Sequence, residues 1–161
     1  MSKVFFIADL HLGHTNILKF AQGSRYGSNI NEHDYWLVEQ WNSVVNTRDV
    51  VYVLGDVAFD IKKLEFMDKM KGSKILLPGN HDNFKLEEYQ KYFYKIIGFS
   101  KYKDYWLSHC PIHTDELRGR FNIHGHVHQR SIKDRRYINV GVEILNGVPI
   151  EFNKIREKYE N

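Results

Sequence analysis

Apolar runs and helical repeats alternate along the first half of the chain. Residues 4–8, 50–54 and 74–77 form short runs rich in Val, Ile, Leu or Phe, which is typical of strands buried on both faces of a sheet. Between these runs, apolar residues recur at helical spacing over residues 31–46 and 61–70. This alternation predicts an α/β unit whose sheet is at least partly parallel.

The first of these helices has an expected buried face and an expected start. Trp36 and Trp41 belong to the apolar repeat that would face the core. Asn31 and Asp34 are the candidates to cap the helix, because their side chains can accept hydrogen bonds from unpaired N–H groups in its first turn.

The second half of the chain has a different pattern. After a short helix expected over residues 86–93, strand candidates follow one another with turn-like residues between them. They span residues 94–99, 105–109, 120–125, 137–140 and 148–152, and a terminal helix is expected over 154–159. We therefore expect the partly parallel sheet of the first half to be joined to a second, more antiparallel sheet.

Composition narrows the class of protein. The length of 161 residues suits a single domain over residues 1–161, and 42% hydrophobic with 27% charged residues is ordinary for a globular protein. Cys110 is the only cysteine, so no intrachain disulfide can form, as in proteins of reducing compartments. No apolar run approaches the roughly 20 residues of a membrane span, and no cleavable signal pattern opens the chain. We expect a cytoplasmic protein without a membrane partner.

The charge is mildly basic, with a formal net charge of +3. Its densest basic cluster is Lys133, Arg135 and Arg136. A solvated loop between strands explains this cluster, and a nucleic-acid contact is the alternative.

Metal-ligand types of side chain gather where the expected strands end. The clusters are Asp9 with His11, then Asp56, then Asn80 with His81 and Asp82, then His109, and last His126 with His128. In α/β sheets, sites form at the carboxyl ends of the strands. Five clusters at five strand ends can therefore converge on one crevice.

The donor types in these clusters indicate a metal site for phosphate chemistry. Carboxylate, amide and imidazole donors without a thiolate suit Mn, Fe, Zn or Ni. Two carboxylates and several histidines neutralise two divalent cations only in part, and the remaining positive charge favours a phosphate ester. Two metal ions roughly 3.5–4 Å apart can clamp the attacking and the leaving oxygen and lower the pKa of bound water.

Each cluster has a simpler explanation when it is taken alone. Asp9 and His11 can be ordinary surface or core residues, and His126 and His128 can form a mononuclear, cupin-like site. Glycines precede three of the clusters, where they permit tight turns and close approach of the backbone, although ordinary loop roles are the alternative. These glycines are Gly55, Gly79 and Gly125. The order of all five clusters and their placement at strand ends favour one shared site.

The motifs together resemble the calcineurin-like metallophosphoesterase superfamily. Asp-x-His, Gly-Asp, Gly-Asn-His-Asp, a single His and Gly-His-x-His occur in this order from Asp9 to His128, which covers most of the chain. The longer opening Asp-Leu-His-Leu-Gly-His and the Asn-Val-Gly-Val-Glu at 139–143 are similar to a small, uncapped bacterial and phage subgroup of phosphoesterases. The resemblance implies a four-layer α/β/β/α sandwich of two mixed β-sheets flanked by helices.

The resemblance also implies a role for each motif residue. Asp9, His11 and His128 would bind a first divalent ion, and Asn80, His109 and His126 a second, with Asp56 bridging both. Mn²⁺ is expected first, with Fe, Zn or Ni as alternatives. A hydroxide between the ions would be the nucleophile. His81 would donate a proton to the leaving oxygen, with Asp82 orienting its ring.

A few residues outside the metal ligands are further candidates. His14 and Arg25 are expected to contact the substrate together with Asn80, with loop or capping roles as the alternative for the first two. Cys110 is expected to be a small buried packing residue beside His109. The remaining histidines are expected to be structural: His33, His113 and His124.

The function that follows from the resemblance is metal-dependent hydrolysis of phosphate esters. A phosphodiesterase is favoured, because no cap domain would enclose the metal centre. A phosphomonoesterase and a nuclease with the same centre are the alternatives, so the substrate can derive from nucleotides or nucleic acids. A non-catalytic scaffold of the same fold is disfavoured by the complete set of motif residues. The oligomeric state stays open.

Overall fold

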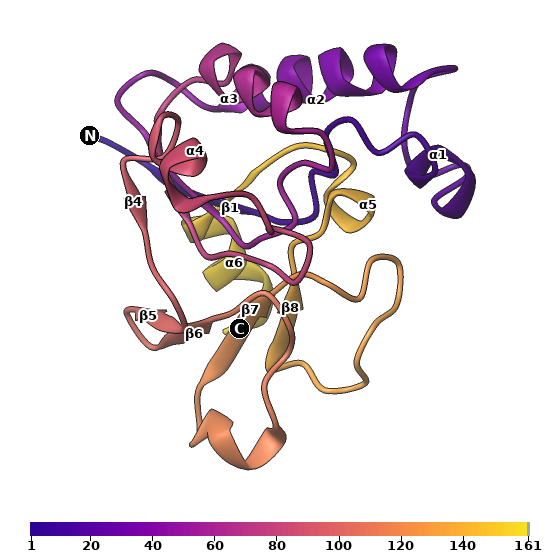
Figure 1. The fold of residues 1–161 in the computed structure, drawn as a ribbon. Helices are drawn as coiled ribbons and strands as arrows, with labels where there is room; N and C mark the ends of the chain where they lie inside the picture. Colours follow the sequence, from indigo (N-terminus) through magenta and orange to yellow (C-terminus); the bar gives the residue numbers. More distant parts are fainter. Residues whose placement is uncertain (161) are drawn as a thin grey trace.

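The first of two β-sheets is built mainly from the first half of the chain (Figure 1). The structure is a computed structural model that describes residues 1–160. The strand order is β4-β3-β2-β1-β9, where β1 to β4 are parallel and β9 is antiparallel to β1. The strands are β1 (Val4–Ile7), β2 (Val50–Val53), β3 (Ser73–Leu76), β4 (Lys95–Ile96) and β9 (Ile150–Glu151). The three apolar runs are therefore strands, as expected.

The second sheet contains the strands of the second half, in the order β5-β6-β7-β8. They are β5 (Ser100–Tyr102), β6 (Tyr105–Leu107), β7 (Phe121–His124) and β8 (Tyr137–Asn139). Only β5 and β6 are antiparallel, whereas β6 pairs with β7 and β7 with β8 in parallel. The expectation of a more antiparallel sheet was wrong, because the connections after β6 and β7 are long enough to return the chain in the same direction.

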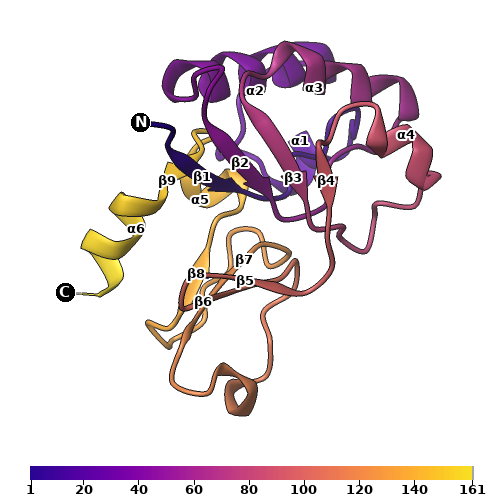
Figure 2. The same ribbon diagram turned by 90° about the vertical axis from the view of Figure 1, so that its left-hand side faces the viewer.

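Helices flank the sheets, and two of them cover the outer face of the first sheet (Figure 2). These two are α2 (Ile30–Val44) and α3 (Phe66–Lys69), the latter preceded by the 3₁₀ helix η1 (Ile61–Glu65). The others are α1 (Ile17–Phe20), α4 (Leu86–Gln90), η2 (Thr114–Leu117), α5 (Val142–Leu145) and α6 (Phe152–Tyr159). The expected fold of two mixed sheets flanked by helices is confirmed.

Two hydrophobic cores lie on opposite faces of the first sheet. Phe5 and Ile7 of β1 face the helices and join a buried cluster that includes Trp41. Phe6 lies in the other cluster, between the sheets, together with Ile155 of α6. Both faces of β1 are therefore buried, which explains its uninterrupted apolar sequence.

The start of α2 differs from the expectation. Asn29, and not Asn31 or Asp34, caps the helix, since its side chain accepts hydrogen bonds from the backbone N–H groups of Asn31 and Glu32. Asp34 is buried one turn into the helix, where its carboxylate is paired with His33 and Lys63.

The carboxyl ends of the central strands of both sheets meet at one place. Ala8, directly after β1, donates to the Val140 carbonyl after β8 and accepts from the Val142 N–H group. Gly125, after β7, donates to the carbonyl of His109, after β6. These bonds join the loops that carry the ligand-type residues. Within residues 1–160, none of the helices has the length and apolar character needed to cross a bilayer.

Candidate metal centre

Two ligand groups lie at the meeting point of the sheets. The first ligand group is Asp9, His11 and His128, whose donor atoms all lie within 4.8 Å of one another. The second ligand group is Asn80, His109 and His126, in which His109 Nε2 lies 3.0 Å from Asn80 Oδ1 and 3.2 Å from His126 Nδ1. The loops after four strands, β1, β3, β6 and β7, thus bring these expected ligand residues together.

His11 in the first group has the properties of a metal ligand. Its Nε2 atom is buried and has no hydrogen-bond partner in the described part of the chain. A buried polar atom without a hydrogen bond destabilises the folded protein unless another group interacts with its lone pair or its proton. Burial, together with the nearby Arg25 charge, lowers the pKa of His11, so the ring is neutral and can coordinate.

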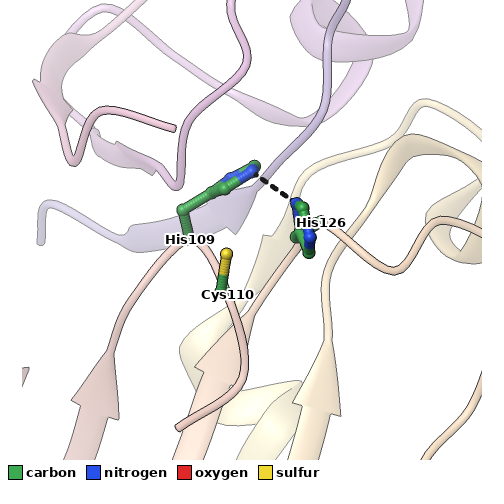
Figure 3. A group of neighbouring side chains, drawn as sticks. All are labelled: His109, Cys110 and His126. Atoms are coloured by element: carbon green, nitrogen blue, oxygen red, sulfur yellow. Dashed lines mark hydrogen bonds between the residues drawn. The ribbon is translucent and has the colours of Figure 1, made fainter. Parts of the chain in front are cut away.

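The second group has ring nitrogens that face one another across a small space (Figure 3). His109 Nδ1 donates to the Leu54 carbonyl at 2.7 Å, which leaves the Nε2 lone pair directed at His126 Nδ1. Two imidazole nitrogens and the Asn80 amide oxygen border the same small space. This set of donors suits a divalent transition metal.

Asp56 lies between the two groups. Its Oδ2 atom is 3.3 Å from His109 Nε2 and 3.7 Å from His11 Nε2. Its Oδ1 atom accepts the backbone N–H of His81 at 2.9 Å. One carboxylate can therefore reach cations held by both groups, so the donors fit a pair of divalent ions.

The backbone at the ligand residues is strained. Positive φ angles, which side chains other than Gly seldom adopt, occur at five ligand residues. They are Asp9 (60°), His11 (53°), Asp56 (54°), His126 (69°) and His128 (51°). Strain of this kind persists where the surrounding structure imposes it, and it concentrates at functional sites.

Two of the glycines are required by close packing at the ligands. A Cβ atom on Gly79 would collide with Asp56 Oδ1, and one on Gly125 would lie 2.6 Å from Asp9 Oδ2. Their role is therefore to admit a carboxylate against the backbone, which the sequence had left open against an ordinary loop role.

A cavity of about 520 Å³ opens beside the first ligand group. His81 is exposed and lines this cavity together with His14, and the ring centroids of His81 and His11 are 6.2 Å apart. His14 stacks on Phe59 at a centroid distance of 4.0 Å, and its Nδ1 lies 3.0 Å from His11 Nδ1. His14 and His81 are thus placed where a substrate can reach them.

Asp82 does not orient the His81 ring as expected. Its Oδ2 atom accepts the backbone N–H groups of Asp56 and Gly79, and its Oδ1 atom accepts that of Val57. Because these backbone donors occupy both carboxylate oxygens, Asp82 instead ties the loop after β2 to the loop after β3.

Arg25 does not contact the cavity, so the expectation that it binds substrate was wrong. Its side chain is fully buried beneath the loop of Asp9, where the guanidinium pairs with Glu143 at 2.8 Å. Glu143 in turn accepts from His128 Nδ1 at 3.0 Å. The sequence did not single out Glu143 as a site residue, although it ends the Asn-Val-Gly-Val-Glu segment.

The side chain of Cys110 also differs from the expectation. It is exposed and not buried, and its sulfur lies within 4.8 Å of the ligand nitrogens of His109 and His126 (Figure 3). His33 and His124 are buried and His113 is exposed, and these three residues belong to neither ligand group.

Two curated proteins are similar to this chain over most of its length. The chain is 32% identical to an uncharacterized protein of Methanocaldococcus jannaschii, over 96% of this chain and 90% of that protein. It is 28% identical to the gene 66 protein of Mycobacterium phage L5, over 89% of this chain and 87% of that protein.

Two solved structures share the fold. A protein of unknown function from Aquifex aeolicus matches with a TM-score of 0.80 and 26% identity, over 98% of this chain and 100% of that one. Pseudomonas putida nuclease MPE matches with a TM-score of 0.53 and 15% identity, over 78% of this chain and 61% of that one. The model of the calcineurin-like phosphoesterase family matches residues 2–152. With its converging carboxylate, amide and imidazole donors, this chain belongs to the calcineurin-like phosphoesterase family, whose members are metal-dependent phosphoester hydrolases.

Proposed function

We propose that this protein is a phosphodiesterase that works with two divalent ions, Mn²⁺ first among them. The observation that carries the proposal is the convergence of both ligand groups on Asp56, beside a buried His11 Nε2 that has no hydrogen-bond partner among residues 1–160. When bound, the two ions would neutralise the charge of the phosphate and make water a stronger nucleophile near neutral pH.

His81 is the proton donor in this proposal. Its backbone N–H is bonded to Asp56 Oδ1, so the residue is fixed beside the bridging carboxylate while its ring stays exposed at the cavity. From there the ring can protonate the oxygen of the departing alcohol, a contribution typically worth about 10²–10⁴-fold in rate. His14 lines the cavity and Asn80 is exposed beside His109, so in this proposal both contact the phosphate oxygens or the ester groups.

The cavity favours a diester over a monoester. Ile17, Phe20 and Phe59 give it an apolar wall beside the first ligand group. A diester carries a second organic group, which this wall can hold out of water, whereas a monoester has no such group. The ring of Phe20 is 74% exposed, so it is free to pack against that group.

A nuclease is the second candidate. The 125–136 loop carries Arg130 beside the cavity and, further along, the basic cluster of Lys133, Arg135 and Arg136. Pseudomonas putida nuclease MPE shares the fold. A nucleic-acid diester is therefore the second class of substrate that we propose. Binding that weakens steeply with added salt would favour this candidate.

The direct test compares a diester with a monoester. Metal-stripped protein is given bis-p-nitrophenyl phosphate or p-nitrophenyl phosphate, with and without Mn²⁺, and the release of p-nitrophenolate is followed. We expect Mn²⁺-dependent hydrolysis that is faster for the diester. Faster hydrolysis of the monoester, or no hydrolysis by protein that has bound Mn²⁺, would contradict the proposal.

A further inference from the structure

A buried ion pair lies behind the first ligand group. The Arg25 guanidinium contacts Glu143 Oε1 through NH2 at 2.8 Å and through Nε at 2.9 Å, and both side chains are fully buried. Burial opposes the ionisation of Glu143, but the His128 hydrogen bond and the Arg25 charge outweigh it and hold the pKa of Glu143 at about 2. The two guanidinium contacts and the His128 hydrogen bond on Glu143 Oε1 favour the charged form of this carboxylate.

Glu143 sets the orientation of one metal ligand. The same Oε1 atom accepts a hydrogen bond from His128 Nδ1 at 3.0 Å. A carboxylate that accepts from one ring nitrogen fixes the tautomer, so the lone pair is on Nε2. That nitrogen is then available to a cation shared with Asp9 and His11.

Arg25 supports the loop that carries the other two ligands. Its NH2 group donates to the Asp9 carbonyl at 2.6 Å, and its NH1 group donates to the Leu10 carbonyl at 2.9 Å. Asp9 and His11 both have positive φ angles, which are unfavourable unless other contacts impose them. The guanidinium bonds hold the two carbonyl groups of this strained loop.

The position of Arg25 is in turn fixed from helix α2. Its NH1 group lies 3.1 Å from His33 Nε2, and His33 Nδ1 lies 3.0 Å from Asp34 Oδ1. Burial lowers the pKa of His33, so its neutral ring donates to Asp34 and accepts from Arg25. Asp34 also pairs with Lys63 Nζ at 3.2 Å. A continuous polar chain thus runs from a surface lysine to a metal ligand.

We propose that Arg25 and Glu143 are positioning residues that shape the first ligand group before any metal binds. The inference rests on the proposed dinuclear centre. The bonds described for this pair lead to Asp9, Leu10, His33 and His128, and none of them leads to the second ligand group. Weakening the pair should therefore lower the affinity of one metal ion and leave that of the other nearly unchanged.

Calorimetric titration of metal-stripped protein with Mn²⁺ tests this inference. Glu143→Gln removes the charge with little change of shape, and Arg25→Lys keeps a charge but loses the planar fork. For both variants we expect one site of wild-type affinity and one site weakened about 10–100-fold, the usual effect of losing a partner behind a metal ligand. Their titrations should match that of His128→Ala and not that of His126→Ala.

A matched control uses an ion pair on the surface. Asp134→Asn weakens the partly exposed pair with Arg136 and should bind two ions as the wild type does. Unchanged affinities in Glu143→Gln and Arg25→Lys, or equal weakening of both sites, would overturn the inference. A wild type that binds no Mn²⁺ would contradict the proposed function itself, and this inference with it.

Discussion

The first ligand group holds side chains in states that are unfavourable without a cation. Burial raises the pKa of Asp9 to about 6, despite the opposing effect of nearby His109 and His128. His11 Nε2 is buried and has no hydrogen bond in the described part of the chain, and both residues have positive φ angles that cost on the order of 1–3 kcal/mol each. A divalent ion would favour the ionised Asp9 and occupy the His11 lone pair.

The raised pKa of Asp9 predicts that the Asp9→Asn substitution stabilises the metal-free protein in a pH-dependent way. Because folding raises the pKa of Asp9 from 3.8 to about 6, its contribution favours the folded metal-free protein at low pH and is lost as the pH rises through that range. At pH 7.5, with a chelator present, we expect the variant to be more stable than wild type by up to about 2–3 kcal/mol, and the difference to vanish near pH 3.5. Urea unfolding at both pH values measures it, and a pH-independent difference would contradict the account.

The proposed role of His81 can be tested by comparing substrates whose leaving groups differ in their need for a proton. His81→Gln should retain both metal ions and lose about 10²–10⁴-fold in turnover on an alkyl diester, whose alkoxide needs a proton. The loss should be much smaller for bis-p-nitrophenyl phosphate, because p-nitrophenolate leaves readily without one. An equal loss on both substrates would rule out His81 as the proton donor.

The sequence predicts ligand residues better than their supporting partners. The expected metal ligands come together because each lies two to four residues after the end of a strand, and strand ends can be recognised from the apolar pattern. The partners of Arg25 and Asp82 could not be predicted in this way. Arg25 is 118 positions from Glu143 and Asp82 is 26 from Asp56, and neither pairing follows from local spacing.

At the scale of elements, Asp82 is the link between two ligand loops. Its carboxylate accepts three backbone N–H groups, those of Asp56, Val57 and Gly79, at 2.7–2.9 Å. Asp56 belongs to the loop after β2 and Gly79 to the loop after β3. Asp56, the proposed bridge between the two ions, and Asn80 are therefore held in register by a residue that belongs to neither ligand group.

Asp82→Asn should destabilise the protein. The amide places an N–H₂ group against backbone N–H donors, which leaves at least one of them unpaired at a cost of about 1–3 kcal/mol. We expect that loss in urea unfolding of the metal-free protein at pH 7.5. Asn83→Ala, at an exposed neighbouring position, is the control and should change stability little. If both variants unfold at the same urea concentration, Asp82 does not link the loops.

The elements of the first half are more predictable than those of the second half. Buried parallel strands such as β1 can be recognised in the sequence as apolar runs, because both of their faces contact a core. The strands of the second sheet have only three or four residues each, and their direction depends on the path of the connecting loops. Helices α1 and α5, with four residues each, are too short for a helical repeat to appear.

At the scale of the whole molecule, the candidate metal centre lies where the two sheets meet. Asp9, Asp56 and Asn80 follow strands of the first sheet, whereas His109 and His126 follow strands of the second. Each ligand group draws on both sheets, because His128 belongs with Asp9 and Asn80 with His109. Binding of metal ions is therefore expected to stabilise the packing of one sheet on the other.

The number of Mn²⁺ ions bound per chain tests the dinuclear centre most directly. Equilibrium dialysis of metal-stripped protein, followed by metal analysis, should give two ions for the wild type. Asp56→Asn, which lacks the carboxylate between the groups, should retain at most one ion tightly, with the fold unchanged by circular dichroism. A wild type that binds fewer than two ions, or an Asp56→Asn variant that still binds two with unchanged affinity, would contradict the account.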